Sequence, residues 1–245
     1  MRNPSSPTLI RSDSGLLRIV VLPTFFLVLS ACTPEDPRQS LVAAWPFDEG
    51  SGVIARDMTG NGHDARLSGA GWGEGRDHGA LVMDGGNDGI VTIALSERLR
   101  ATDRGITLSA WTYRTSDHNV AVVSHSYPAL FFGFHGMQFK WQFTDASGGD
   151  VACYADAAHV AELDRWIHLA ATWDGWRARL YADGEEICSN WDWGRMAMPE
   201  LPFTIGGYVD DNGAIVDELT GRLDDVRIYD RALSDKEIRA LAGAS

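Results

Sequence analysis

Hydrophobic and polar side chains alternate along many short segments of the chain after residue 41. In the segment Ile106–Tyr113, three apolar residues (Ile106, Leu108 and Ala110) fall on one face and the residues between them on the other. This period of two predicts β-strands that bury one face, because successive side chains of a strand point to opposite sides. Gly, Asp-Gly and Asn-Gly recur between such segments, which favours tight turns over long loops.

The clearest group of strands lies within Trp166–Asn190. It reads WIHLAATW, Asp174-Gly175, WRARLYA, Asp183-Gly184 and EEICSN, which predicts three strands joined by tight hairpins. The Asp-Gly pairs suit type I′ turns, since both central residues of such a turn need positive φ.

Two further strands are expected over Leu201–Gly207 and Gly221–Tyr229. Only the segment that begins at Ser234 has a helical pattern, with Ser234 as N-cap and Glu237 three residues later, the spacing of a capping box. About a dozen short strands and one short C-terminal helix predict an all-β fold over residues 41–245. We expect two antiparallel sheets packed as a jelly-roll sandwich.

Residues 1–31 resemble a lipoprotein signal peptide. Three arginines precede the uncharged run Ile19–Ala31, which is shorter than the about 20 residues of a membrane span and fits the apolar part of a signal peptide. The run ends in Leu29-Ser30-Ala31-Cys32, which is similar to a bacterial lipobox. We therefore expect lipidation at Cys32, a polar tether over residues 32–40, and a lipid-anchored protein of the bacterial cell envelope outside the cytoplasm. A buried apolar strand with an incidental cysteine is the alternative.

With Cys32 lipidated, an even pair of cysteines remains. An oxidising compartment favours a Cys153–Cys188 disulfide, although two separate buried thiols would also fit the sequence.

The charge balance bears on partners. The formal net charge is −13 and the sequence has no basic run, which argues against a nucleic acid partner, since phosphate binding needs clustered cations.

Several motifs in order resemble bacterial laminin G-like domains of the concanavalin A-like superfamily. They are VAAWPFDEGSG (42–52), DMTGNGH (57–63), LVMDG (81–85), LSAW (108–111), WIHLA (166–170), LYADG (180–184) and GRLDDVRIYDRALS (221–234). The resemblance covers nearly the whole chain after residue 41. It implies a concanavalin A-like sandwich with one concave face, often a bound calcium ion, and binding rather than chemistry.

The resemblance directs attention to a Gly-rich acidic turn. Asp57 and Asn61 offer hard oxygen ligands at short spacing, which calcium needs, and Asp48 and Asp224 would join them from other strands. The alternative is that Asp and Asn only form turns here. We expect a structural calcium ion held by these four residues.

Aromatic residues beside polar ones are candidates for glycan contacts, because the C–H faces of a sugar ring stack on aromatic rings. Core packing is the alternative for each of them. The candidates are Trp141, Tyr154, Trp191, Trp193 and Tyr208.

Hydrolysis is the competing chemistry, since this superfamily also contains glucanases. Their two carboxylates lie on one strand in a Glu-x-Asp-x-(x)-Glu pattern, which this sequence lacks, and it also lacks a Gly-x-Ser-x-Gly nucleophile motif. A carboxylate pair split between two strands stays open. We expect no enzyme but a membrane-anchored, calcium-stabilised, lectin-like module that binds glycan or protein at the cell surface or in the periplasm. A glycoside-active enzyme of the same fold and a purely adhesive or structural domain are the alternatives.

Overall fold

The computed structural model describes residues 36–86, 88–156 and 158–243, and strands dominate this part of the chain. The expected signal peptide and Cys32 lie outside the described residues. The described part belongs to a single compact unit that begins at Asp36.

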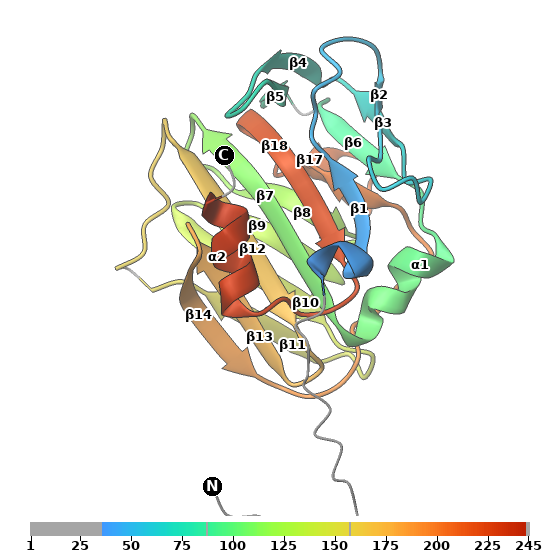
Figure 1. The fold of residues 1–245 in the computed structure, drawn as a ribbon, viewed down its shortest axis with the longest axis vertical. Coiled ribbons are helices and arrows are strands. Elements are labelled where there is room, and N and C mark those ends of the chain that lie inside the picture. The colour runs from blue at the N-terminus through green and yellow to red at the C-terminus, as the bar shows by residue number, and fades with distance from the viewer. Residues whose placement is uncertain (1–35, 87, 157, 244–245) are drawn as a thin grey trace, which may run out of the picture. The chain divides into compact units, whose positions relative to one another are not determined.

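Two eight-stranded antiparallel sheets make up the unit (Figure 1). Along sheet A, in hydrogen-bonded order, lie β14 (Glu185–Trp191), β13 (Arg177–Ala182), β12 (Trp166–Trp173), β7 (Ile106–Arg114), β18 (Thr220–Tyr229), β5 (Gly79–Asp84) and β4 (Gly71–Glu74), and β1 (Leu41–Trp45) pairs with β18. Along sheet B lie β11 (Asp150–Tyr154), β10 (Gln138–Thr144), β9 (Leu130–His135), β8 (Val120–His125), β15 (Phe203–Ile205), β6 (Ile90–Ile93), β3 (Ala65–Ser68) and β2 (Ile54–Ala55). A separate hairpin pairs β16 (Tyr208–Val209) with β17 (Ile215–Val216).

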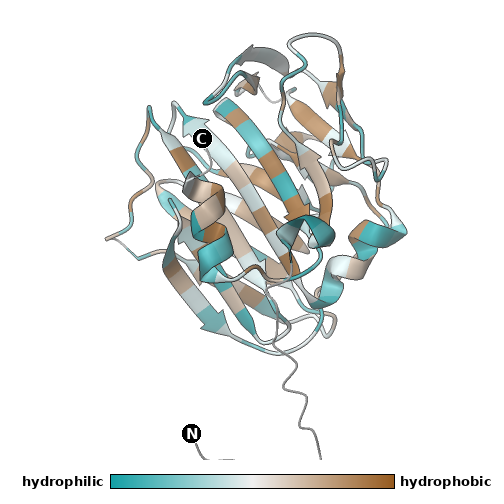
Figure 2. Ribbon diagram, viewed as in Figure 1, coloured by the Kyte–Doolittle hydropathy of each residue, from teal (hydrophilic) through white to brown (hydrophobic). Residues whose placement is uncertain are grey.

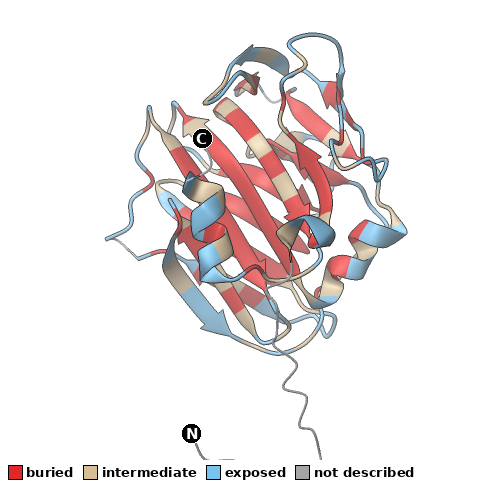
Figure 3. Cartoon of the chain, viewed as in Figure 1, coloured by how far each residue is buried: buried red, intermediate tan, exposed pale blue. Residues whose placement is uncertain are grey.

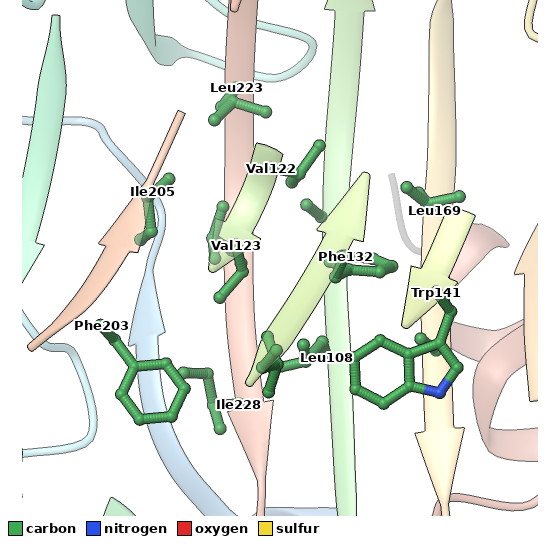
Figure 4. Packing of buried hydrophobic residues seen from close by; sticks show 14 of the residues in the cluster. Leu108, Val122, Val123, Phe132, Trp141, Leu169, Phe203, Ile205, Leu223 and Ile228 are labelled. Atoms are coloured by element: carbon green, nitrogen blue, oxygen red, sulfur yellow. The ribbon is translucent and has the colours of Figure 1, made fainter. Parts of the chain in front are cut away.

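The hydrophobic core lies between the two sheets. Ile106, Leu108 and Ala110 are buried in it, which confirms the alternation predicted for β7. Leu108 and Leu223 of sheet A belong to the same apolar cluster as Phe132 of sheet B (Figure 4). Hydropathy varies along the strands (Figure 2), but both faces of the central strands β7, β8 and β12 are almost wholly buried (Figure 3). The two-sheet sandwich expected from the sequence is therefore confirmed.

The C-terminal helix α2 (Asp235–Gly243) covers part of the outer face of sheet A (Figure 1). Its Ile238 packs with Leu233 against Tyr181. The expected capping box is present, since Ser234 N donates to Glu237 Oε2 at 2.7 Å and Glu237 N donates to Ser234 Oγ at 3.4 Å.

Three shorter helical segments were not expected from the sequence. They are α1 (Glu97–Arg100) and the 3₁₀ helices η1 (Pro37–Ser40) and η2 (Ala101–Arg104). Since η1 lies in the expected tether and buries Ser40, the folded unit begins a few residues before 41. Among the described residues, no helix is long and apolar enough to cross a membrane.

The two Asp-Gly hairpins form different turns. Asp183 and Gly184 both have positive φ, at 49° and 84°, as the type I′ prediction requires. In the other hairpin only Gly175 has positive φ, and β13 does not begin until Arg177. Here the carboxylate of Asp174 accepts hydrogen bonds from the amides of Trp176 and Arg177, which stabilises a longer turn than predicted.

A disulfide between Cys153 and Cys188 confirms the expected pairing. It joins β11 at the edge of sheet B to β14 at the edge of sheet A. Beside it, Asn190 Nδ2 donates to the carbonyl oxygen of Ala152 at 3.0 Å. The two sheets are thus held together along this edge by a covalent bond as well as by the core.

Candidate ligand-binding site

Strand β10 carries a lysine on the face opposite the core. Phe139 and Trp141 point into the core, so the alternation of the strand places Lys140 on the outer face of sheet B. Lys140 is nevertheless only 5% exposed. A lysine is almost never this buried without a paired charge or a ligand, because its ammonium loses its water.

Three aromatic rings surround this ammonium and a fourth stacks on one of them. We call these four residues the aromatic cluster: Tyr127, Phe131, Tyr154 and Tyr208. The Lys140 Nζ lies 4.4 Å from the ring centre of Phe131, 5.3 Å from that of Tyr127 and 5.6 Å from that of Tyr154. Tyr208, from the β16–β17 hairpin, stacks on Tyr127 with ring centres 5.0 Å apart. Cation–π attraction of this kind stabilises the charge at close range.

Two rings of the cluster are open to a ligand, whereas Phe131 is buried beneath them. Tyr127 is 39% exposed and Tyr154 is 45% exposed. Among the described residues, Lys140 Nζ makes no hydrogen bond to a protein acceptor, so its three N–H donors are available. The cluster therefore combines flat apolar faces with a strong donor.

Burial and neighbouring charges shift the pKa values of Lys140 and of two groups near it. Burial lowers the pKa of Lys140, and the nearby carboxylates of Asp217 and Asp150 oppose that shift. Burial also raises the pKa of Asp217, against the attraction of Lys140. For Tyr208, burial and then Asp217 raise the pKa to about 12, so its hydroxyl keeps its proton at neutral pH.

One hollow adjoins the cluster, and a second lies beyond the end of β10. A hollow of about 460 Å³ is lined by Tyr127, by Thr144 at the end of β10 and by the segment Ala197–Pro199. A second hollow, of about 380 Å³, is lined by Asp145–Ser147 and Asp192–Arg195. Ala197 N donates to the Thr144 carbonyl oxygen and Ala146 N donates to that of Arg195, so the same paired segments border both hollows.

The five aromatic candidates from the sequence separate into three environments. Tyr154 and Tyr208 belong to the cluster. Trp141 is fully buried, packed against Phe132 and Phe143, and has no surface for a ligand (Figure 4). The expectation for Trp141 is corrected for this reason: its position on β10 points into the core.

The two remaining candidates, Trp191 and Trp193, are highly exposed. Trp191 ends the edge strand β14 and lies over the guanidinium of Arg177, with 5.2 Å between the Arg177 Cζ and the ring centre. Trp193 lines the smaller hollow. The structure therefore places Trp193 in a concave setting near the end of β10, whereas Trp191 lies on an open edge strand.

Two of the four expected calcium ligands are engaged in hydrogen bonds within their own turn. The Asp57 carboxylate accepts from Ala44 N, Thr59 N and His63 N at 3.0–3.2 Å. The Asn61 side-chain amide donates to the Val42 carbonyl oxygen at 2.8 Å. These bonds attach the turn to β1.

The other two expected ligands lie against a different loop. Asp224 Oδ2 accepts from Arg76 N at 3.0 Å and Asp48 Oδ1 accepts from Gly79 N at 2.9 Å. Within the described residues, the one group of three or more acidic, histidine or cysteine side chains close enough to share an ion is Asp84, Asp88 and Glu218. None of the four expected ligands belongs to it.

Sequence reasoning missed Lys140, Tyr127 and Phe131. A signal was present, since Lys140 is one of two lysines in the chain and interrupts the apolar run QFKWQF. Tyr127 comes from the loop after β8 and Tyr208 from a separate hairpin, and no local pattern links them to β10.

The sequence profile of the concanavalin A-like lectin/glucanases superfamily (Laminin_G_3) matches residues 84–239. The chain therefore belongs to this superfamily. A search of curated protein sequences gives no significant match.

Solved structures share the fold at low sequence identity. The binding domain of Paraclostridial Mosquitocidal Protein 1 aligns with a TM-score of 0.70 and 16% identity over 85% of this chain and 53% of that one. Domain 4 of AbnA, a GH43 extracellular arabinanase from Geobacillus stearothermophilus in complex with arabinotriose, aligns at 0.63 and 18% over 83% and 98%. A botulinum neurotoxin DC binding domain in complex with SialylT aligns at 0.65 and 13% over 85% and 52%.

These neighbours are binding domains, and at such identities they establish the fold alone. The chain spans about half the length of the toxin binding domains and nearly all of the arabinanase domain.

Proposed function

We propose that the protein is a lectin-like binding module that holds a glycan, or a surface protein, at the aromatic cluster on the outer face of sheet B. The observation that carries this proposal is the Lys140 ammonium, nearly buried, free of hydrogen bonds to described residues and flanked by the exposed rings of Tyr127 and Tyr154.

The chemistry of the cluster suits a sugar. A pyranose or furanose ring presents apolar C–H faces that stack on tyrosine rings, while its hydroxyl or carboxylate oxygens accept hydrogen bonds. Lys140 supplies the donors and Asp217 a nearby acceptor. The sugar complexes of two structural neighbours, with arabinotriose and with SialylT, support a glycan as the first ligand to test.

The proposal also includes the location of the module. Lipidation at Cys32, after cleavage of residues 1–31, would anchor it in the bacterial cell envelope outside the cytoplasm. The lipobox-like sequence and the disulfide support this placement, since disulfides persist in oxidising compartments. We also propose that the module holds one calcium ion with a structural role.

We propose binding without catalysis. The sequence lacks the one-strand Glu-x-Asp-x-(x)-Glu pattern of the glucanases of this fold, which supports this part of the proposal. Turnover of a polysaccharide that is lost when one acidic residue is replaced would contradict this part.

Glycan-array screening followed by isothermal titration tests the binding site. The compact unit begins at Asp36, so a chain that starts at residue 33 keeps the whole fold. We expect Tyr154→Ala and Lys140→Met to weaken binding of any array hit at least tenfold, because each removes one of the contacts described above.

Trp191→Ala is the matched control, since it removes an exposed aromatic ring from the other sheet. It should bind as the unmodified chain does. Loss of binding in Trp191→Ala with normal binding in Tyr154→Ala and Lys140→Met would move the site away from the cluster. If no glycan on the array binds and the protein binds envelope proteins instead, the adhesive alternative would be favoured.

A further inference from the structure

Three connections between the two sheets meet at one end of the sandwich. Asp84 ends β5 of sheet A, and Asp88 lies in the loop that leads from there to β6 of sheet B. Glu218 lies on the connection that enters β18, and Thr220 pairs with Asp84. Gly69, from the connection between β3 and β4, packs so closely on Asp88 that a Cβ there would overlap the Asp88 carbonyl oxygen.

The Glu218 side chain is the unusual member of this group. It is 2% exposed, and neither carboxylate oxygen has a hydrogen-bond partner among the described residues. Burying a carboxylate without a donor or an opposite charge costs several kcal/mol. A bound cation would supply the opposite charge that this buried carboxylate lacks among the described residues.

Two glycines lie so close to these carboxylates that a side chain in their place would crowd the oxygens. A Cβ on Gly89 would overlap Glu218 Oε1, and a Cβ on Gly86 would lie 3.1 Å from Asp84 Oδ1 and 3.4 Å from Asp88 Oδ1. The three carboxylates offer ligand oxygens that all lie within 4.8 Å of one another. The glycines thus let the chain close around these oxygens.

From these observations we infer that Asp84, Asp88 and Glu218 bind one calcium ion. The ligand set is all oxygen and carries three negative charges, which favours a hard divalent cation over zinc or copper. Calcium accepts irregular shells at 2.3–2.6 Å, whereas magnesium demands an octahedron at 2.0–2.1 Å and gives up its waters reluctantly.

The ion links the ends of both sheets. It joins the β5–β6 loop to the segment that carries Asp217 and leads from the β16–β17 hairpin, the source of Tyr208. The inference names ligands for the calcium ion of the proposed function, and in that respect rests on it, but it does not depend on glycan binding.

Calcium titration of metal-free protein tests the site. Protein stripped with chelator and verified by elemental analysis should bind one calcium ion per chain in isothermal titration. A hundredfold excess over the dissociation constant should raise Tm by about 5–10 °C, and magnesium should raise it less. Glu218→Gln and the double variant Asp84→Asn/Asp88→Asn should lose both the heat and the Tm rise.

Two controls separate this site from other acidic groups. Asp211→Asn removes an exposed carboxylate outside the group, and Asp224→Asn removes one of the ligands expected from the sequence; both should keep the calcium response. Absence of heat and of a Tm shift in the unmodified chain would overturn the inference. A response that survives Glu218→Gln but disappears in Asp224→Asn would overturn it as well. Neither measurement involves a glycan, so failure of this site and failure of the lectin proposal are distinguishable.

Discussion

His168 on β12 is a buried titratable residue outside the binding site. Its ring packs edge-on against Trp111, with ring centres 5.2 Å apart, and it is almost completely buried. Burial lowers the pKa of His168 to about 4, and the positive charges of Arg227 and Arg76 add to the shift against the attraction of Asp183. The folded protein therefore keeps this imidazole neutral where an unfolded chain would protonate it.

The first prediction concerns acid stability. The unfolded chain protonates His168 below about pH 6.5, but the folded protein does so only near pH 4, so the free energy of unfolding falls as pH drops through this window. The loss attributable to His168 is about 3 kcal/mol at most. His168→Gln should flatten the dependence of the urea midpoint on pH between 7 and 4.

The second prediction concerns Asp224, whose effect on the free energy of unfolding changes with pH in the opposite direction to that of His168. Burial raises its pKa to about 6, so the folded protein holds a proton that the unfolded chain releases near pH 4, and this contribution to stability is lost as pH rises through 6. Asp224→Asn should therefore gain stability relative to the parent above pH 6 and show a steeper loss below it. Parallel urea profiles for Asp224→Asn and the parent would contradict this assignment.

At the scale of elements, the disulfide between β11 and β14 connects the two sheets at their edges. The cysteines are 35 residues apart, and closing a loop of that length stabilises the fold by about 3–4 kcal/mol in the chain-entropy account. The double variant Cys153→Ala/Cys188→Ala should lower Tm by roughly 6–15 °C. Peptide maps with and without reductant should show the cross-link in the exported parent. Free alkylation of both thiols in folded, exported protein would contradict the pairing.

Strands and turns differ in how far local sequence predicts them. The strands β12, β13 and β14 and the capping box of α2 follow patterns within a few residues, and each is present as predicted. The turn at Asp174 is longer than predicted because its carboxylate binds two amides, which an Asp-Gly pair alone does not reveal. The short helix α1 was missed because four residues carry too little periodicity.

At the scale of the whole molecule, the anchor gives a further prediction. If the Leu29–Cys32 box directs lipidation, Cys32→Ser should abolish labelling by a palmitate analogue and release the protein from the membrane fraction or leave it unprocessed. The chain carrying Cys32 unchanged, expressed in the same cells, is the control. Equal labelling and equal membrane retention of the two chains would refute the lipoprotein assignment.

The sequence by itself determined the class of fold and the positions of several strands, among them β7, β12 and β18. Alternation, Asp-Gly turns and helix caps act between residues close in the chain, and the burial of alternate side chains then requires a second layer, hence a sandwich. The motifs in order along the chain also sufficed for the superfamily, which the profile over residues 84–239 establishes.

Only the tertiary structure decided which side chains share a site. It placed Trp141 in the core and the adjacent Lys140 outside it, beside rings from a loop and a distant hairpin. It also brought Glu218 to Asp84 and Asp88, about 130 residues earlier in the chain, and left Asp57 and Asn61 bonded to β1. Strand register and the crossings between sheets set these contacts, and they depend on packing across the whole domain rather than on any local pattern.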